Sequence, residues 1–551
     1  MLKPIPWICE PSRKLERLLA ALLLAVFLLE GGWALVHMSA TGDETHYLGM
    51  GRYLIKYQKW DLDDTLLQPP LSYYLHSIPL LPLSIDDRLF NIPQINARGR
   101  ALMNSRSDDR LLILARIPIL FLAAGLGWLV YCWGEQAYGG TGGLLALFLY
   151  VFHPVIIGNS VQITPDLCLA FFSTLTVYLL WRYRHRPDWG RSLAVGFALG
   201  LSLLSKYSAV LIVLALLILV LLPPAARRLG SEATPYRWGF RHFVLILLAA
   251  LFLVNAGYMF RGLFPTLKGN AFRSSLFRSI EPVPVLRDIP MPIPRAYLAG
   301  LDLQHSVVEN GFLSYLLGRK SQRGWFHYYL VAFFLKSPIP FLLLIVLAAW
   351  KGRDRLQWLV LAPLIIFPLY FSAVRLSRGV RYILPAYPLL CVWISQLALS
   401  AKERPIRPAM RWGIIFFLAW YAAGTLRVSP HYVAYINELG GGPGNGVNLL
   451  FESDFDWGQE MKGLRAYLGE KKIDRIKFAY FSTADPGHYG IPYETLPCVS
   501  PPKRESGVIA ASATVLQTWG CYDWLKEYQP VDKVGYTIFI YDIPAAETTR
   551  K

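Results

Sequence analysis

Residues Leu18–Val36 read LLAALLLAVFLLEGGWALV, and Thr41–Tyr47, just beyond them, read TGDETHY. The first stretch has Glu30 as its only charged residue and approaches the ~20 residues that a helix needs to cross a ~30 Å hydrocarbon core. We therefore predict a membrane helix, with Asp43 and Glu44 at the membrane surface. Carboxylates there can act as a general base, bind a cation or belong to a hydrated loop. Taken alone, the stretch favours the hydrated loop.

The composition indicates a polytopic membrane protein. Of 551 residues, 54% are hydrophobic, 14% aromatic and only 17% charged, which is too apolar for an ordinary globular chain of this size. The formal net charge of +18 could suggest nucleic-acid binding. However, the Lys and Arg residues fall mostly in short segments between apolar runs rather than along one basic face. We therefore predict membrane lipid, and no nucleic acid, as a partner.

Six cysteines, at positions 9, 132, 168, 391, 498 and 521, form no CxxC motif and no Cys/His cluster. Neither a zinc site nor a redox motif is indicated. Only Cys498 and Cys521 share one hydrophilic region, which motivates the hypothesis of a disulfide in an external domain.

The apolar runs predict an all-α polytopic membrane domain with about 11 transmembrane helices, residues 1–427, and a small C-terminal α/β domain, residues 428–551. The runs lie at about 18–36, 111–131, 143–158, 166–181, 192–204, 208–222, 243–260, 327–349, 356–372, 382–398 and 412–427. In the tail, residues 476–481, 508–512 and 536–542 read as strands and residues 457–469 as a helix. The spacing of Asp456-Trp457-Gly458-Gln459 favours a helix N-cap over sugar binding.

The basic residues predict the orientation of the chain. With the N-terminus in the cytoplasm, four basic clusters lie inside, as the positive-inside rule requires. The clusters are Arg182/Arg184/Arg186/Arg191, Arg227/Arg228/Arg237/Arg241, Lys351/Arg353/Arg355 and Lys402/Arg404/Arg407/Arg411. Residues 37–110, 261–326 and 428–551 then share the external face. The segment 261–326, rich in Pro and Arg, reads as a rigid loop or short-helix lid.

Four cations are misplaced by the same rule, on the side of the acidic pair. Lys206 interrupts an apolar run, so it must snorkel or pair with an anion. Arg375, Arg378 and Arg381 occupy an external turn. Together they suggest an anionic ligand, with phosphate favoured. Asp166, after Thr164-Pro165, is compatible with a functional acid or with a plain acid of a helix first turn.

Five motifs, taken in order, resemble those of the polyprenyl-phosphate-sugar-dependent membrane glycosyltransferases. This group includes the protein O-mannosyltransferases (glycosyltransferase family 39) and the bacterial aminoarabinose transferases. The resemblance covers about residues 1–430, and the motifs are Asp43-Glu44, QPPLSYY at 68–74, Thr164-Pro165-Asp166, the turn Leu204-Ser205-Lys206-Tyr207, and RGVRYILP at 378–385. The tail motifs NELGG at 437–441 and DFDWGQ at 454–459 look like those of bacterial family 39-type proteins.

The resemblance implies a GT-C fold in a bacterial plasma membrane, a lipid-linked sugar donor and a catalytic acid in the first external loop. Asp43 is the expected base, and Glu44 is expected to orient the acceptor or a divalent cation; the cation, the sugar and the acceptor (protein, lipid or glycan) stay open. The expected donor-phosphate ligands are Lys206, Arg378 and Arg381, and the expected substrate-binding or orienting residues are Tyr47, Gln68, Pro69, Tyr73 and Asp166.

Two alternatives stay open at this point. A transporter or flippase for lipid-linked sugars would also need cations near the membrane surface, but it would more naturally show internal repeats and acids near the bilayer midplane. An O-antigen-type ligase or polymerase is another membrane transferase, and the early Asp-Glu pair argues against it.

The basic clusters generate a test of the predicted topology. A reporter fused after Lys551 should be active outside the cytoplasm, and one fused near Pro187 should be active inside, because the intervening spans carry the tail across. Alkaline phosphatase and green fluorescent protein fusions measure the two locations. Opposite activities would refute the shared external face.

Overall fold

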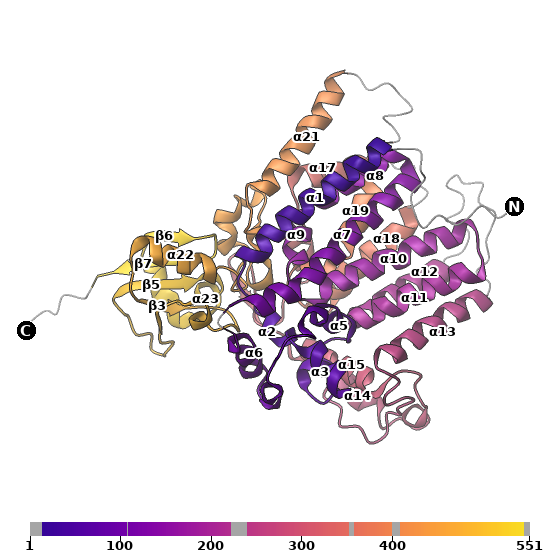
Figure 1. The fold of residues 1–551 in the computed structure, drawn as a ribbon, viewed down its shortest axis with the longest axis horizontal. Coiled ribbons are helices and arrows are strands. Elements are labelled where there is room, and N and C mark those ends of the chain that lie inside the picture. The colour runs from indigo at the N-terminus through magenta and orange to yellow at the C-terminus, as the bar shows by residue number, and fades with distance from the viewer. Residues whose placement is uncertain (1–13, 107, 222–239, 352–356, 399–407, 545–551) are drawn as a thin grey trace, which may run out of the picture.

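A computed structural model of the chain describes residues 14–106, 108–221, 240–351, 357–398 and 408–544 (Figure 1). Each of the eleven predicted apolar runs is helical there, in whole or in part. The helices concerned are α1 (Lys14–His37), α7 (Arg110–Tyr138), α8 (Gly140–Val151), α9 (Pro154–Ser160), α10 (Pro165–His185), α11 (Trp189–Ser205), α12 (Val210–Leu221), α13 (Phe240–Gly257), α16 (Tyr328–Lys336), α17 (Ile339–Lys351), α18 (Gln357–Ala373), α19 (Ala386–Ile394) and α21 (Pro408–Leu426).

Two of the runs are broken rather than straight. Helices α8 and α9 meet at 65°, and α16 and α17 at 112°. A proline lies at each break, at Pro154 and at Pro338. Proline has no backbone N–H, so it cannot donate the hydrogen bond that would continue the preceding helix. By length and composition, three described helices, α1, α7 and α13, can cross a membrane, or five spans if each bent pair counts as one. The all-α class is confirmed, but eleven apolar runs are not eleven straight spans.

Part of the topology argument lies outside the described residues. This holds for the basic residues Arg227, Arg228, Arg237, Arg353, Arg355, Lys402, Arg404 and Arg407.

Residues 37–110, the segment predicted to be the first external one, fold into short helices against the bundle. They are α2 (Glu44–Tyr47), α3 (Met50–Tyr57), α4 (Asp63–Leu66), α5 (Leu71–Ser77) and α6 (Ile95–Asn104). A buried ion pair joins them, because Arg98 Nη1 lies 2.5 Å from Asp64 Oδ2 and neither side chain is more than 3% exposed. Asp64 also accepts the Tyr73 hydroxyl through its backbone oxygen at 2.8 Å. This segment, which begins with the acidic pair, is therefore held together by buried contacts of its own.

Residues 261–326, the predicted second external segment, contain two helices and a hairpin and are called the lid below. These are α14 (Ser275–Ile280), α15 (Arg295–Asn310) and the antiparallel pair β1 (Ser314–Leu316) and β2 (Arg319–Ser321). Asp302 of α15 accepts the backbone N–H of Arg273 at 2.7 Å and that of Ser274 at 2.9 Å. Asp302 thus joins the segment just before α14 to α15.

The predicted α/β tail is confirmed as a five-stranded sheet at one end of the molecule (Figure 1). The strand order is β4-β3-β5-β7-β6, with β3 parallel to β4 and β5, and β7 antiparallel to β5 and β6. The elements are α22 (Met461–Lys471), β3 (Ile476–Ala479), β4 (Tyr493–Thr495), β5 (Gly507–Ser512), α23 (Ala513–Thr518), β6 (Asp532–Val534) and β7 (Ile538–Ile543). Apolar side chains of α22, such as Leu464, pack on Phe478, Ala510 and Ile540 of the sheet.

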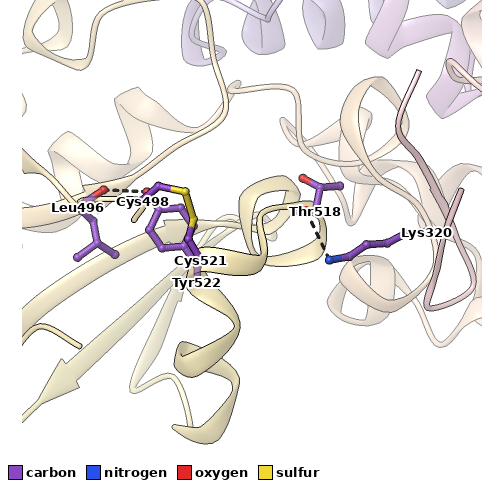
Figure 2. Close-up of a disulfide and its surroundings, with 6 residues drawn as sticks. All are labelled: Lys320, Leu496, Cys498, Thr518, Cys521 and Tyr522. Atoms are coloured by element: carbon purple, nitrogen blue, oxygen red, sulfur yellow. Dashed lines mark hydrogen bonds between the residues drawn. A yellow bond between two sulfur atoms is a disulfide. The ribbon is translucent and has the colours of Figure 1, made fainter. Parts of the chain in front are cut away.

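The hypothesised disulfide between Cys498 and Cys521 is present (Figure 2). Beside it, the Tyr522 hydroxyl donates to the Leu496 carbonyl at 2.7 Å. On the other side, Lys320 of the β1–β2 hairpin reaches the Thr518 carbonyl at 3.4 Å (Figure 2). The disulfide therefore closes a part of the tail that the lid touches.

A thiol count tests the disulfide. After denaturation without reductant, only the four cysteines other than Cys498 and Cys521 should react with an alkylating reagent, and all six should react after reduction. Intact-mass spectrometry gives the number of adducts. In the control Cys498→Ser, Cys521 should become reactive before reduction; alkylation of all six cysteines in the unreduced native sequence would contradict the assignment.

Candidate active site

Four charged residues singled out from the sequence meet in one network, although 338 positions separate its ends. Arg381 Nη1 lies 2.8 Å from Asp43 Oδ2 and 3.7 Å from Asp166 Oδ2. Lys206 Nζ donates to Asp166 Oδ1 at 2.5 Å. The residues come from the first external segment, the start of α10, the break after α11 and the segment before α19. The structure therefore brings two carboxylates and two cations together.

Asp43 is placed by the turn that precedes α2. Gly42 donates its backbone N–H to the Trp457 carbonyl at 3.0 Å, and a Cβ at Gly42 would meet Trp457 Nε1 at only 2.7 Å. A side chain at this position would force the two segments apart. The Asp43 side chain remains 26% exposed. Asp43 is thus held firmly while its carboxylate stays reachable.

The pKa of Asp43 is set by opposing influences. Burial, the largest single one, raises it, but Arg381, His46 and Arg378 together outweigh burial, so that the pKa lies below its ordinary value of 3.8. Asp43 is therefore an ionised carboxylate at neutral pH, the form that accepts a proton.

Glu44, the adjacent residue, is completely buried and fully engaged. Arg116 of α7 meets it twice, Nε to Oε1 at 2.8 Å and Nη2 to Oε2 at 2.5 Å, with both side chains 0% exposed. Backbone N–H groups of Thr41 and Ile163 donate to the same carboxylate, at 2.9 and 3.1 Å. This geometry favours an orienting role for Glu44, through the backbone that carries Asp43.

Arg116 was not among the residues predicted for the site, although a cation inside an apolar run was a usable signal. Besides Glu44, it donates to the carbonyls of Leu35, Met38 and Ser39 at 2.8–3.2 Å. The end of α1 and the loop that follows it are thereby fastened to α7.

Lys206 has the anionic partner that its position in an apolar run requires. It lies in extended backbone between α11 and a short 3-10 turn, and its side chain is 7% exposed. Besides Asp166, which is fully buried, the Tyr382 ring lies 3.9 Å from Lys206 Nζ. Tyr382 is a further site residue that sequence reasoning left without a role.

Arg378 and Arg381 belong to the arginine turn, residues 375–381, which the tail holds in place. The Val380 N–H donates to Asp454 Oδ1 at 2.8 Å, and the Ser453 hydroxyl donates to the Arg378 carbonyl at 2.8 Å. The Arg381 guanidinium lies on the Trp457 ring, 4.3 Å from its centre. The tail therefore forms one wall of the site.

Arg378 is engaged away from Asp43. Its Nη1 lies 2.5 Å from Glu452 Oε1, and its guanidinium lies 3.6 Å from the centre of the Phe312 ring. Phe312 and Ser377 line a cavity of about 460 Å³ between the lid and the arginine turn. Arg378 thus stands between this cavity and the network around Asp43.

The tail residues Glu452, Asp454 and Trp457 were missed as site residues. The interpretation of Asp456 as the N-cap of the following helix is wrong: α22 begins at Met461, and Asp456 accepts the Thr514 N–H at 2.7 Å instead. The motif departs from the capping pattern because its backbone turns inward toward residues 39–42 before the helix starts.

Of the predicted orienting residues, two aromatic ones contact each other with tilted rings. The Tyr47 and Tyr73 rings lie 5.7 Å apart, and both side chains are buried. Burial raises the pKa of Tyr47, and the charge of Asp43 raises it further. Gln68 and Pro69 lead into α5, as the helix-start interpretation predicted, and within the described residues neither joins the ion pairs around Asp43.

Metal binding is not decided by the geometry. Across the ranges that the structure describes, no group of three or more His, Cys, Asp and Glu side chains is arranged to hold a metal ion. The divalent cation therefore stays an open expectation.

Comparisons with known proteins give distant likenesses in fold. No curated protein matches the chain. Its fold is similar to that of ArnT from Cupriavidus metallidurans bound to undecaprenyl phosphate (TM-score 0.47, 12% identity, 96% of this chain and 98% of that chain covered). It is also similar to the oligosaccharyltransferase AglB from Archaeoglobus fulgidus (0.45, 12%, 97% and 75%) and to the Saccharomyces cerevisiae Pmt1-Pmt2 complex (0.29, 20%, 44% and 32%). Such distant likenesses identify neither donor nor acceptor here.

A family model gives the more specific match. Residues 111–254, from α7 to α13, match the family described as dolichyl-phosphate-mannose-protein mannosyltransferase. This stretch contains Asp166 and Lys206 of the network above, and Arg116, the partner of Glu44. Over residues 111–254, the family model thus confirms the resemblance to polyprenyl-phosphate-sugar-dependent membrane glycosyltransferases that the motifs predicted.

Proposed function

We propose that this chain is an inverting glycosyltransferase that moves a sugar from a polyprenyl-phosphate-linked donor to an acceptor hydroxyl or phosphate on the extracytoplasmic side of a bacterial plasma membrane. The observation that carries the proposal is the contact between Asp43 and Arg381. An ionised, partly exposed carboxylate lies 2.8 Å from a cation that also faces Asp166. A proton acceptor and the positive charge for a leaving phosphate thus share one site.

In the proposed reaction, a hydroxyl acceptor gives its proton to Asp43 while its oxygen forms a bond to the anomeric carbon of the donor. The bond from that carbon to the phosphate oxygen breaks, and its electron pair leaves with the lipid phosphate. Attack from the face opposite the phosphate inverts the anomeric configuration. The phosphate gains one negative charge in this step, so cations near it stabilise the transition state more than the bound donor.

Each network residue has a part in this proposal. Arg381 and Lys206 supply charge to the phosphate, and Arg378 supplies more from the side of the cavity. Asp166 is fully buried between Lys206 and Arg381, which suits it to hold both cations in position. Preorganised charge of this kind lowers a barrier because it needs no rearrangement during the reaction.

The proposal divides the chain into a transferase domain, residues 1–427, and an extracytoplasmic domain, residues 428–551. The cavity of about 460 Å³ beside Arg378 offers room for a substrate group at the contact between lid and arginine turn.

Purified protein that releases polyprenyl phosphate from a radiolabelled polyprenyl-phosphate sugar, in step with glycosylation of an acceptor, would support transfer. Movement of the intact donor across vesicle membranes without release would support a flippase instead.

Substitution of the base is the first test. Asp43→Asn keeps size but removes proton acceptance, so kcat should fall on the order of 10²–10⁴-fold while donor binding largely survives. The matched control is Asp63→Asn, because the Asp63 side chain belongs to the same external segment and is 62% exposed. Single-turnover kinetics on both purified variants measure the effect. Near-normal transfer by folded Asp43→Asn protein would remove the base from the mechanism.

The pH profile is the second test. Because the pKa of Asp43 lies below 3.8, acidification from pH 7 to pH 5 should leave the base ionised. In Arg381→Gln, burial still raises this pKa but its strongest opposing charge is gone, so the acid limb of kcat/KM should move to higher pH. Arg475→Gln is the control, since Arg475 is a 68% exposed tail arginine that pairs with Glu494. An acid limb at the same pH in Arg381→Gln as in the native sequence would show that the titrating group is not Asp43.

A further inference from the structure

The contact between Glu452 and Arg378 joins a tail carboxylate to a cation proposed to bind the donor. Glu452 Oε1 lies 2.5 Å from Arg378 Nη1, and the side chains are 11% and 21% exposed. Glu452 also has a φ of +49°, in the left-handed region that a residue with a Cβ rarely adopts. Strained backbone of this kind persists where surrounding structure enforces it, commonly at functional sites.

In the ion pairs that Lys206, Arg378 and Arg381 make, cations and carboxylates are equal in number. Three cations, Lys206, Arg378 and Arg381, face three carboxylates, Asp43, Asp166 and Glu452, and each cation touches at least one of them. A donor phosphodiester brings one more negative charge, and the lipid phosphate that leaves carries up to two. Binding therefore adds uncompensated negative charge unless one carboxylate gives up its cation.

Of the three carboxylates, Glu452 is the one that can leave. Asp43 must stay as the proposed base, and Asp166 is completely buried with Lys206 and Arg381 on its two oxygens. Glu452 has one ion-pair partner within the described residues and retains some exposure. Moving its side chain needs no change at the acids that would carry the chemistry.

The frame around Glu452 is fixed by other contacts. Asp454 accepts the Val380 N–H and the Tyr328 hydroxyl, at 2.8 and 2.7 Å, and its backbone oxygen accepts Lys336 Nζ at 2.7 Å. The arginine turn therefore keeps its place when the Glu452 carboxylate moves. Phe312 covers a face of the Arg378 guanidinium, so a phosphate would approach its N–H groups, where Glu452 already holds Nη1.

We propose that Glu452 is the resident counter-ion of Arg378 and that the donor phosphate displaces its carboxylate on binding. The proposal rests on the proposed function, because it takes the anionic ligand to be a polyprenyl phosphate. It gives the C-terminal domain a direct part in the donor site: the carboxylate screens Arg378 while the site is empty and competes with the phosphate for the same N–H groups.

Binding of farnesyl phosphate to the purified full-length chain tests the competition. Glu452→Gln removes the competing charge, so the dissociation constant should fall on the order of tenfold, within the range of ordinary coupling between two ligands of one site. Glu452→Asn should give the same direction, and Asn tolerates left-handed backbone if Gln disturbs folding there. Glu527→Gln is the matched control, because Glu527 is a 58% exposed tail glutamate paired with Arg504, and it should change nothing.

A double-mutant cycle makes the test specific to Arg378. In an Arg378→Gln background, the gain from Glu452→Gln should largely vanish, because no cation is left to compete for. Unchanged or weaker binding by folded Glu452→Gln and Glu452→Asn, or a gain that persists in full without Arg378, would overturn the inference while native binding upholds the proposed function. A native chain that neither binds farnesyl phosphate nor uses a polyprenyl-phosphate sugar would overturn the proposed function itself.

Discussion

The buried ion pair of Arg116 and Glu44 is the constraint on which the geometry of the site depends. Two charges in an apolar interior are costly unless every donor and acceptor is used, and loss of one partner from such a pair costs about 3–5 kcal/mol. Here the cost is offset by backbone groups from two further segments: N–H groups of Thr41 and Ile163 donate to Glu44, and carbonyls between residues 35 and 39 accept from Arg116. These segments can satisfy the pair in one arrangement, and Asp43 is the next residue along the chain. The two adjacent acids thus have different environments: Glu44 is fully buried, whereas Asp43 is partly exposed.

The second constraint is the tail. The Arg381 guanidinium lies on the Trp457 ring. Asp454 holds the backbone of the arginine turn by accepting the Val380 N–H. Trp457 in turn accepts the Gly42 N–H, next to Asp43, the proposed base. The network is therefore closed through residues from the first and last fifths of the chain, with the membrane helices between them.

Much of this arrangement could be predicted from the sequence, for physical reasons that differ between residues. Apolar runs of membrane length must be helical, because helices satisfy their own backbone hydrogen bonds, and the described runs are. Lys206 needed an anion because a lysine in an apolar run cannot stay unpaired, and Asp166 is that anion. The breaks at Pro154 and Pro338 were not predicted. Hydropathy averages composition over a window, so it does not respond to the loss of one backbone N–H donor at a proline.

Other parts could not be predicted, because they depend on distant segments meeting. Nothing in the local pattern of Asp454–Gln459 distinguishes an acid that caps the next helix from one that binds a turn about 75 residues earlier. Arg116 differs from these residues: like Lys206, it is a cation inside an apolar run and so a usable signal, but one cation hardly changes the mean hydropathy of the run. The role of Glu452 beside Arg378 likewise requires knowledge of where the tail docks.

The docking of Trp457 between Gly42 and Arg381 has a consequence for biosynthesis. A ribosome completes the chain from the N-terminus, so the bundle with Asp43, Asp166 and Lys206 is made before the segment that carries Trp457. Until that segment arrives, Arg381 lacks its aromatic support and the arginine turn lacks Asp454. A nascent or prematurely terminated chain can therefore form its helices without these contacts, and the network is complete only when residues 454–457 have folded back onto the segment around Gly42.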